Sequence, residues 1–215
     1  MVDIGLSDQL TQQQVVDILG AVEQGFDAQL DFTRQLMAYP SLRGQEHHAQ
    51  QFLYQALSGR GYEMDQWAID LAEIREHPGF SPVKVGYENA VNVVATHHPI
   101  NSIGRSLILN GHIDVVPTGP EAMWTKPPFE PTVNGDWLYG RGGADMKAGL
   151  VANLFAMDAL RTIGMQPAAR VCLQSVTEEE CTGNGALSCL VRGYRADAVL
   201  IPEPEENMLV RANVG

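Results

Sequence analysis

The 215-residue sequence lacks long apolar runs, disulfide-rich segments and any excess of basic residues. No stretch reaches the roughly 18 apolar residues that a membrane-spanning helix needs, so we do not expect a membrane protein. The three cysteines, Cys172, Cys181 and Cys189, form no CxxC pair, and their odd number argues against a disulfide framework. We expect reduced thiols, mostly core filler, in a cytoplasmic protein. The first ten residues show no secretory signal.

The balance of charge is acidic, with 26 acidic residues against 14 basic ones and a formal net charge of −12. A nucleic-acid partner is therefore not expected, because phosphate binding needs a basic face. The acidity can reflect a solvated surface or carboxylates gathered around a metal, and bulk charge does not distinguish the two. No internal repeat or low-complexity segment is present.

Hydrophobic periodicity indicates strands that alternate with helices. Thr11 to Gln14 has the form of a capping box at the start of a long helix, and the charged segment 69–87, with its prolines, predicts a surface loop. We predict helices over residues 11–37, 46–58, 147–163 and 185–191, and strands over 92–95, 107–109, 137–139, 171–176 and 198–201. This order predicts an α/β fold with three α/β/α layers, an open sheet with helices on both faces. Ligands of such sheets lie beyond the carboxyl ends of the strands.

A first candidate motif, Gly111-His-Ile-Asp-Val-Val-Pro117, follows one predicted strand. His112 stands at the strand tip, and Asp114 lies on the same side if the chain stays extended. A carboxylate beside a metal-binding histidine can hold its other ring nitrogen. A surface or core histidine without a metal is the alternative.

A second motif, Gly140-Arg-Gly-Gly-Ala-Asp-Met-Lys-Ala-Gly149, surrounds Asp145 with glycines. These glycines let the backbone pack closely and bring the Asp145 carboxylate near another group. An N-capping aspartate for the next helix is the alternative. The glycine and lysine order of a phosphate-binding loop is absent.

Two further acidic motifs follow the later strands. Glu178, Glu179 and Glu180 come directly after strand 171–176, where three adjacent carboxylates are costly without a cation. Glu203, between two prolines, follows the last predicted strand. A solvated helix start and an exposed loop carboxylate are the respective alternatives.

The four motifs lie roughly 25 to 35 residues apart, which is the length of one βα unit, so their side chains can converge on one edge of the sheet. One histidine with several carboxylates suits zinc, with cobalt or manganese as substitutes. Two such metals would share a carboxylate and flank a water molecule.

With these motifs in this order, the sequence resembles the metallohydrolase family of acetylornithine deacetylase, succinyl-diaminopimelate desuccinylase, aminoacylase and glutamate carboxypeptidase. The resemblance begins near Asp31 and implies a zinc exopeptidase-like catalytic domain. It implies that His112 and Glu203 bind one metal, that Asp145 bridges both, and that Glu180 binds the second. It also implies that Asp114 orients His112 and that Glu179 is the general base. The family usually has aspartate at the position of Glu178; a register shifted by one would make Glu178 the base and Glu179 the ligand.

Family members continue, after the Glu-Pro strand, into a lid domain and a return to the catalytic domain that supplies another histidine ligand. The sequence ends at Asn213-Val-Gly215, where this lid would begin. Residues 1–215 are therefore expected to be the N-terminal portion of a catalytic domain, truncated before the lid. Family members often dimerise through that lid, so a homodimer is expected of the intact protein only.

The resemblance implies a two-metal hydrolase of an amide bond. A deacylase of an N-acyl amino acid, of the acetylornithine type, is the first choice, and a carboxypeptidase or dipeptidase is the alternative. The substrate would be a small N-acyl amino acid or peptide. The 215 residues alone are expected to show little or no hydrolysis. A fragment that is not an enzyme, and that binds one metal loosely or none, is the competing hypothesis.

Overall fold

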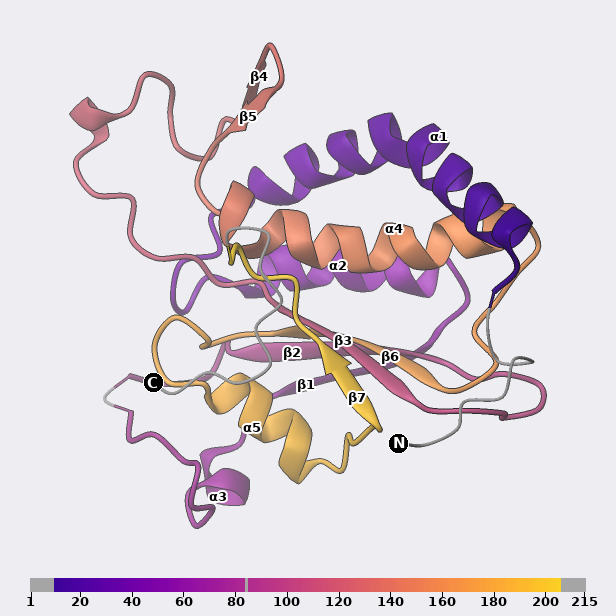
Figure 1. Ribbon diagram of the computed structural model, residues 1–215. Coiled ribbons are helices and arrows are strands. Elements are labelled where there is room, and N and C mark those ends of the chain that lie inside the picture. The colour runs from indigo at the N-terminus through magenta and orange to yellow at the C-terminus, as the bar shows by residue number, and fades with distance from the viewer. Residues whose placement is uncertain (1–9, 84, 206–215) are drawn as a thin grey trace.

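A five-stranded sheet between two layers of helices forms the centre of the molecule in the computed structural model, which describes residues 10–83 and 85–205 (Figure 1). One layer holds three helices, which are α1 (Gln12–Met37), α2 (His47–Ser58) and α4 (Ala148–Thr162). The other layer holds α3 (Leu71–Ile74) and α5 (Asn184–Val191). The predicted three-layer α/β/α arrangement is confirmed.

The strand order decides where the motifs meet. Across the sheet the strands are β1 (Glu63–Ala68), β2 (Val91–His97), β6 (Val171–Val176), β3 (Leu107–His112) and β7 (Ala198–Leu200). β3 is parallel to both β6 and β7, whereas β2 is antiparallel to β6 and to β1. The carboxyl ends of β3, β6 and β7 therefore lie at the same edge, with His112 opposite Val176.

The two faces of the sheet carry separate cores. On the face under α2 and α4, Leu53, Val93, Leu109 and Leu154 belong to one buried cluster, which fixes these helices to the central strands. On the opposite face, a smaller cluster joins the strands to α5 through Cys189. The central strands are buried on both faces, which explains their nearly continuous apolar sequence.

The long first helix is confirmed, together with its predicted capping box. The Gln14 backbone N–H donates to the Thr11 hydroxyl, and the Gln14 side chain accepts from the Thr11 backbone N–H. However, the apolar side chains in the N-terminal half of α1 are largely exposed: Leu19 is 62% exposed and Phe26 53%. The described residues bury α1 mainly through its last turns, at Leu36 and Met37.

Two expectations from the sequence are wrong. The segment 69–87 is not only a surface loop, because Ile69, Ile74 and Tyr87 are buried in a third cluster with Leu187. Strand β1 was not expected, because its polar and half-exposed side chains lack an apolar pattern. The short predicted strand β5 (Trp137–Tyr139) pairs with β4 (Thr132–Asn134) in a separate hairpin. Two irregular turns complete the chain, Glu121–Met123 and Gly143–Lys147.

Among residues 10–83 and 85–205, no helix is both long enough and apolar enough to cross a bilayer. Cys172 and Cys189 are buried thiols, as expected, and Cys181 is an exposed one. The N-terminal residues considered for a secretory signal and the stretch Asn213-Val-Gly215, where a lid was expected to begin, lie outside the described residues, apart from Leu10.

Candidate metal centre

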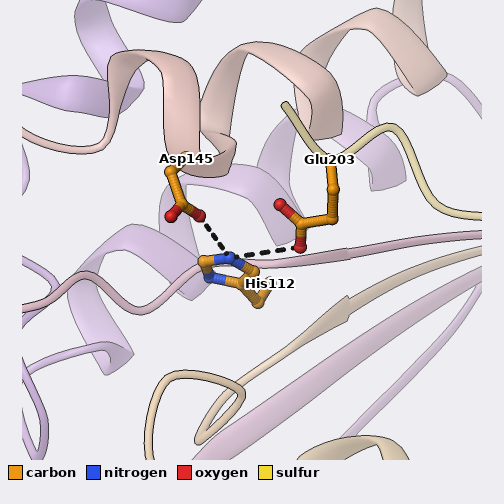
Figure 2. Close-up of side chains that lie close together, drawn as sticks. All are labelled: His112, Asp145 and Glu203. Atoms are coloured by element: carbon orange, nitrogen blue, oxygen red, sulfur yellow. Dashed lines mark hydrogen bonds and ion pairs between the residues drawn. The ribbon is translucent and has the colours of Figure 1, made fainter. Parts of the chain in front are cut away.

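His112, Asp145 and Glu203 converge at the carboxyl edge of the sheet (Figure 2). His112 ends β3, Asp145 lies in the turn that precedes α4, and Glu203 follows β7. The Nε2 atom of His112 lies 2.9 Å from Asp145 Oδ1 and 3.5 Å from Glu203 Oε1. One ligand atom from each residue lies within 4.8 Å of the others, a spacing that one cation can bridge.

The orientation of the His112 ring is fixed by Asp114. Its Nδ1 atom lies 2.9 Å from the backbone carbonyl oxygen of Asp114 and 3.6 Å from the Asp114 carboxylate. A carbonyl can only accept, so Nδ1 carries a proton and donates it, and Nε2 is the ring nitrogen that faces Asp145 and Glu203 and can bind a metal when it carries no proton. With Nε2 unprotonated, this is the tautomer that a metal-binding histidine requires.

Asp114 also connects two of the motifs. Its carboxylate accepts the backbone N–H of Glu179 at 3.3 Å and that of Glu180 at 3.2 Å. The side chain is 3% exposed, and this burial raises the pKa of its carboxyl group. The residue predicted to orient the histidine therefore also fixes the backbone that carries two candidate site residues.

The three consecutive glutamates have different surroundings. Glu179 is half exposed and places Oε2 3.8 Å from His112 Nε2. Glu180 stands outside the group of three ligand atoms, but burial and the nearby carboxylate of Asp145 raise the pKa of its carboxyl group. Glu178 is 2% exposed, and its carboxylate accepts hydrogen bonds from Arg43 and Tyr87.

The site carries more negative charge than its surroundings balance. Burial, and to a smaller extent the carboxylates of Asp145, Glu179 and Glu180, raise the pKa of Glu203 to about 7 against the lowering effect of His112. Burial alone would lower the pKa of His112, yet Asp114, Glu203 and Glu179 together raise it above its usual value. Carboxylates that compete for protons in this way are relieved by a bound cation. The residues present therefore fit a divalent metal ion.

Two glycines of the second motif make this convergence sterically possible. Gly142 has a φ of 77°, and a Cβ there would lie 2.6 Å from Val115 Cγ1. A Cβ on Gly149 would collide with the carbonyl oxygen of Pro202, the residue before Glu203. The expectation that these glycines allow close packing around Asp145 is confirmed. Gly149 specifically lets α4 approach the chain that carries Glu203.

Sequence reasoning did not identify four buried or partly buried polar residues around the site: Arg43, Glu46, Tyr87 and Lys147. Lys147 is fully buried and donates to the carbonyl oxygens of Leu36 and Tyr39, so it ties the Asp145 turn to the end of α1. The basic residue in the second motif was visible in the sequence, but its partners are backbone atoms more than 100 residues away. No sequence pattern marks such contacts.

Comparison with known proteins gives a family match and several relatives. Residues 108–213 match the family described as peptidase family M20/M25/M40. The chain is 35% identical over 193 residues to N-formyl-4-amino-5-aminomethyl-2-methylpyrimidine deformylase of Halalkalibacterium halodurans, which covers 88% of this chain and 41% of that protein. The corresponding Bacillus subtilis deformylase is 29% identical over 90% of this chain and 42% of its own length. The chain thus spans about two fifths of the length of these curated relatives.

Solved structures with the same fold include two peptidases. The dipeptidase Dug1p from Saccharomyces cerevisiae aligns with a TM-score of 0.65 and 17% identity, over 82% of this chain and 37% of that one. The M20 family metallo-carboxypeptidase Sso-CP2 from Sulfolobus solfataricus aligns with a TM-score of 0.62 and 22% identity, over 81% and 37%. Identities this low show the shared fold alone. The family match and the deformylase relatives lead to one conclusion: residues 108–213 are similar to peptidase family M20/M25/M40, and the chain shares its fold with a member of the M20 family.

Proposed function

We propose that the natural gene product containing this chain is a metal-dependent hydrolase that removes a small acyl group from an amine. The observation that carries the proposal is the meeting of His112, Asp145 and Glu203 around one point, with the Glu179 carboxylate beside it. The similarity to a curated deformylase, at 35% identity, supports cleavage of a linear amide.

The convergence of His112, Asp145 and Glu203 supports part of the proposed ligand set, and the family resemblance supplies the rest. His112 and Glu203 would hold one metal ion, Asp145 would be shared by two, and Glu180 would hold the second. Zinc suits one imidazole with several carboxylates, and cobalt or manganese can replace it. When bound, such ions polarise an amide carbonyl and make a water molecule more acidic.

The chain's own residues would then move the proton. Glu179 takes a proton from the attacking water as its oxygen bonds to the amide carbon, and the same carboxyl group delivers that proton to the nitrogen as the C–N bond breaks. The products are a carboxylic acid and an amine, and at neutral pH the acid's proton passes to the amine to give a carboxylate and an ammonium ion, so atoms and charge balance. Asp114 keeps the His112 ring in one orientation throughout, because its carbonyl oxygen holds Nδ1.

The surroundings of Glu178 support this assignment of the triplet over the register shifted by one. Its carboxylate is not among those within 4.0 Å of the His112 ring nitrogens and already accepts hydrogen bonds from Arg43 and Tyr87. A general base must reach the attacking water, and Glu179 is the half-exposed carboxylate beside His112. We therefore propose Glu179 as the base and Glu180 as the ligand.

The identity of the acyl group that is removed is a separate question. The motifs resemble those of acetylornithine deacetylase, whereas the curated relatives are named as deformylases of an aminomethylpyrimidine. We propose an N-acyl amine substrate with formyl as the first choice and acetyl, as in N-acetylornithine, as the second.

The test is a hydrolysis assay on the gene product that contains these residues. The substrates are N-formyl-4-amino-5-aminomethyl-2-methylpyrimidine, N-acetylornithine and an unmodified dipeptide, with the released amine measured directly. We expect amine release from an N-acyl substrate, loss of activity with a chelator, and recovery with Zn²⁺ or Co²⁺. Glu179→Gln should lower kcat by about 10²- to 10⁴-fold. Full activity in Glu179→Gln would contradict the assigned mechanism.

A further inference from the structure

The carboxylate of Glu178 accepts more hydrogen bonds than that of Glu179 or Glu180. Arg43 donates to both of its carboxylate oxygens, from Nε at 2.6 Å and from Nη2 at 2.7 Å. The Tyr87 hydroxyl donates to Oε2 at 2.5 Å, and the Thr182 hydroxyl does so at 3.1 Å. Four donors thus hold one buried carboxylate, which makes its position well defined.

The partners of Glu178 come from segments far apart in the chain. Arg43 lies in the turn before α2, and Tyr87 lies in the segment before β2. Tyr87 is 6% exposed and accepts a hydrogen bond from Asn184, the first residue of α5, at 3.1 Å. Three parts of the fold therefore fix the loop that leaves β6.

The backbone conformation of Glu178 also restrains the residues that follow it. Its φ of 66° is unusual for a residue with a side chain and disfavoured by about 1 kcal/mol, so other contacts must maintain it. Its carbonyl oxygen accepts from the backbone N–H of Thr182 and of Gly183, which closes the loop. The next two backbone N–H groups donate to the Asp114 carboxylate. With Glu178 turned inward and held, Glu179 and Glu180 follow on a backbone fixed to the residue that orients His112.

We propose that Arg43 and Tyr87 are positioning residues: by holding the inward-facing Glu178 carboxylate, they set the direction in which Glu179 and Glu180 project at the metal centre. Neither residue touches the ligand atoms of His112, Asp145 or Glu203. Their effect on turnover rests on the proposed reaction, whereas their effect on metal binding rests only on the proposed role of Glu180 as a ligand.

The molecule contains a matched control for this inference. On the surface formed by β1 and the end of α5, Arg192 donates to both oxygens of Asp65, from Nε at 2.7 Å and from Nη2 at 2.9 Å. The Tyr194 hydroxyl donates to the same carboxylate at 2.8 Å. The chemistry of this second cluster repeats that of the first, but its contacts do not extend to the metal-centre residues.

The experiment compares Tyr87→Phe with Tyr194→Phe in the gene product that contains the chain. Each variant keeps the ring and loses one hydroxyl that donates to a carboxylate. The metal is removed, and Co²⁺ is titrated back while its visible absorption is followed; the free energy of unfolding, kcat and KM are measured in parallel. Arg43→Lys, which retains the charge but not the two-pronged geometry, is the second variant.

We expect Tyr87→Phe to weaken the second equivalent of Co²⁺ by about tenfold, as one lost hydrogen bond to a charged group can do, while the first equivalent binds as before. Tyr194→Phe should leave both equivalents unchanged within about twofold. We expect kcat to fall in Tyr87→Phe and Arg43→Lys with KM nearly constant, because the substrate is not contacted.

Several outcomes would overturn the inference. If Tyr87→Phe and Tyr194→Phe destabilise the fold similarly and both bind Co²⁺ as the unchanged protein does, Arg43 and Tyr87 serve stability alone. A loss of both equivalents in Arg43→Lys and Tyr87→Phe would likewise contradict a role directed at Glu179 and Glu180. If no substrate is hydrolysed but the second equivalent is selectively weakened, the positioning role stands and the proposed function fails.

Discussion

Two clusters of arginine, carboxylate and tyrosine with nearly the same hydrogen bonds lie in different parts of this protein. In the site cluster, the Glu178 side chain is 2% exposed and Arg43 35%. In the surface cluster, the Asp65 side chain is 30% exposed and Arg192 39%. Since water competes for exposed ions and not for buried ones, identical contacts differ in what their loss does. Burial and connection to other residues, rather than the ion pair itself, therefore decide how much stability is lost when the pair is removed.

The largest expected effect comes from replacing the arginine of each cluster. Arg43→Met removes the counterion of a buried carboxylate, so we expect the free energy of unfolding to fall by about 3 kcal/mol. Arg192→Met removes an exposed partner and should cost less than about 1 kcal/mol. Urea denaturation of both variants measures the difference, and equal losses would refute the distinction.

A second test uses a buried carboxyl group that has no arginine. Glu46 is fully buried, accepts the Gly44 backbone N–H at 2.9 Å, and leaves Oε2 without a partner among the described residues. Burial raises its pKa from 4.5 to about 7. The folded state therefore binds this proton more tightly than the unfolded state, and the corresponding stability is present below pH 4.5 and lost as the pH rises through about 7.

Glu46→Gln should abolish that loss, because the amide does not ionise. At pH 8 we expect the variant to be more stable than the unchanged chain by up to about 3 kcal/mol, and at pH 4 the difference should disappear. Free energies of unfolding of both proteins in a chelator, from pH 4 to 8, give the comparison. A constant difference across this range would show that Glu46 does not titrate as stated.

Glycines allow a third contrast between the site and the surface. Gly149→Ala places a Cβ against the Pro202 carbonyl oxygen, which should displace Glu203 and weaken the first equivalent of Co²⁺ by about tenfold or more, about 1.4 kcal/mol in binding free energy. The readout is a Co²⁺ titration, with helix content by circular dichroism as the control. Unchanged affinity would show that the chain accommodates the Cβ without moving Glu203.

The smallest expected effect has the opposite sign. A Cβ on Gly25, in α1, would meet no atom within 4 Å in the described structure. Gly25→Ala should therefore raise the free energy of unfolding by about 0.5–1 kcal/mol through helix propensity, with Co²⁺ binding unchanged. Thermal unfolding measures the gain, and destabilisation would mean that α1 is packed more closely there than the contacts indicate.

The sequence predicted the parts of the site that follow the parallel strands. Parallel strands end at one edge, so polar residues after β3 and β7 had to lie near each other, and the structure brings His112 and Glu203 together with Asp145. The order of strands across the sheet was not predictable, because it depends on pairing between distant segments. Strand β1 was missed since it lies at an edge and keeps polar side chains.

Arg43 and Tyr87 were missed for a different reason. Their importance comes from one shared partner, Glu178, which lies 135 and 91 positions away in the sequence. Local patterns report the period of a helix or strand and the residues of a turn. Local patterns do not report an ion pair between two distant loops. Such a pair is recognised only when both loops have been placed in space.

The long separation between Arg43 and Glu178 has a consequence for the order in which the protein is made. A ribosome that adds about 5–20 residues per second needs roughly 7 to 27 s to travel from one residue to the other. During that interval the guanidinium group has no carboxylate to meet, and the helices that follow it can form without one. The loop that carries Glu179 and Glu180 therefore gains its final geometry after the helices that follow Arg43 have formed, and metal capture should follow that step rather than guide it.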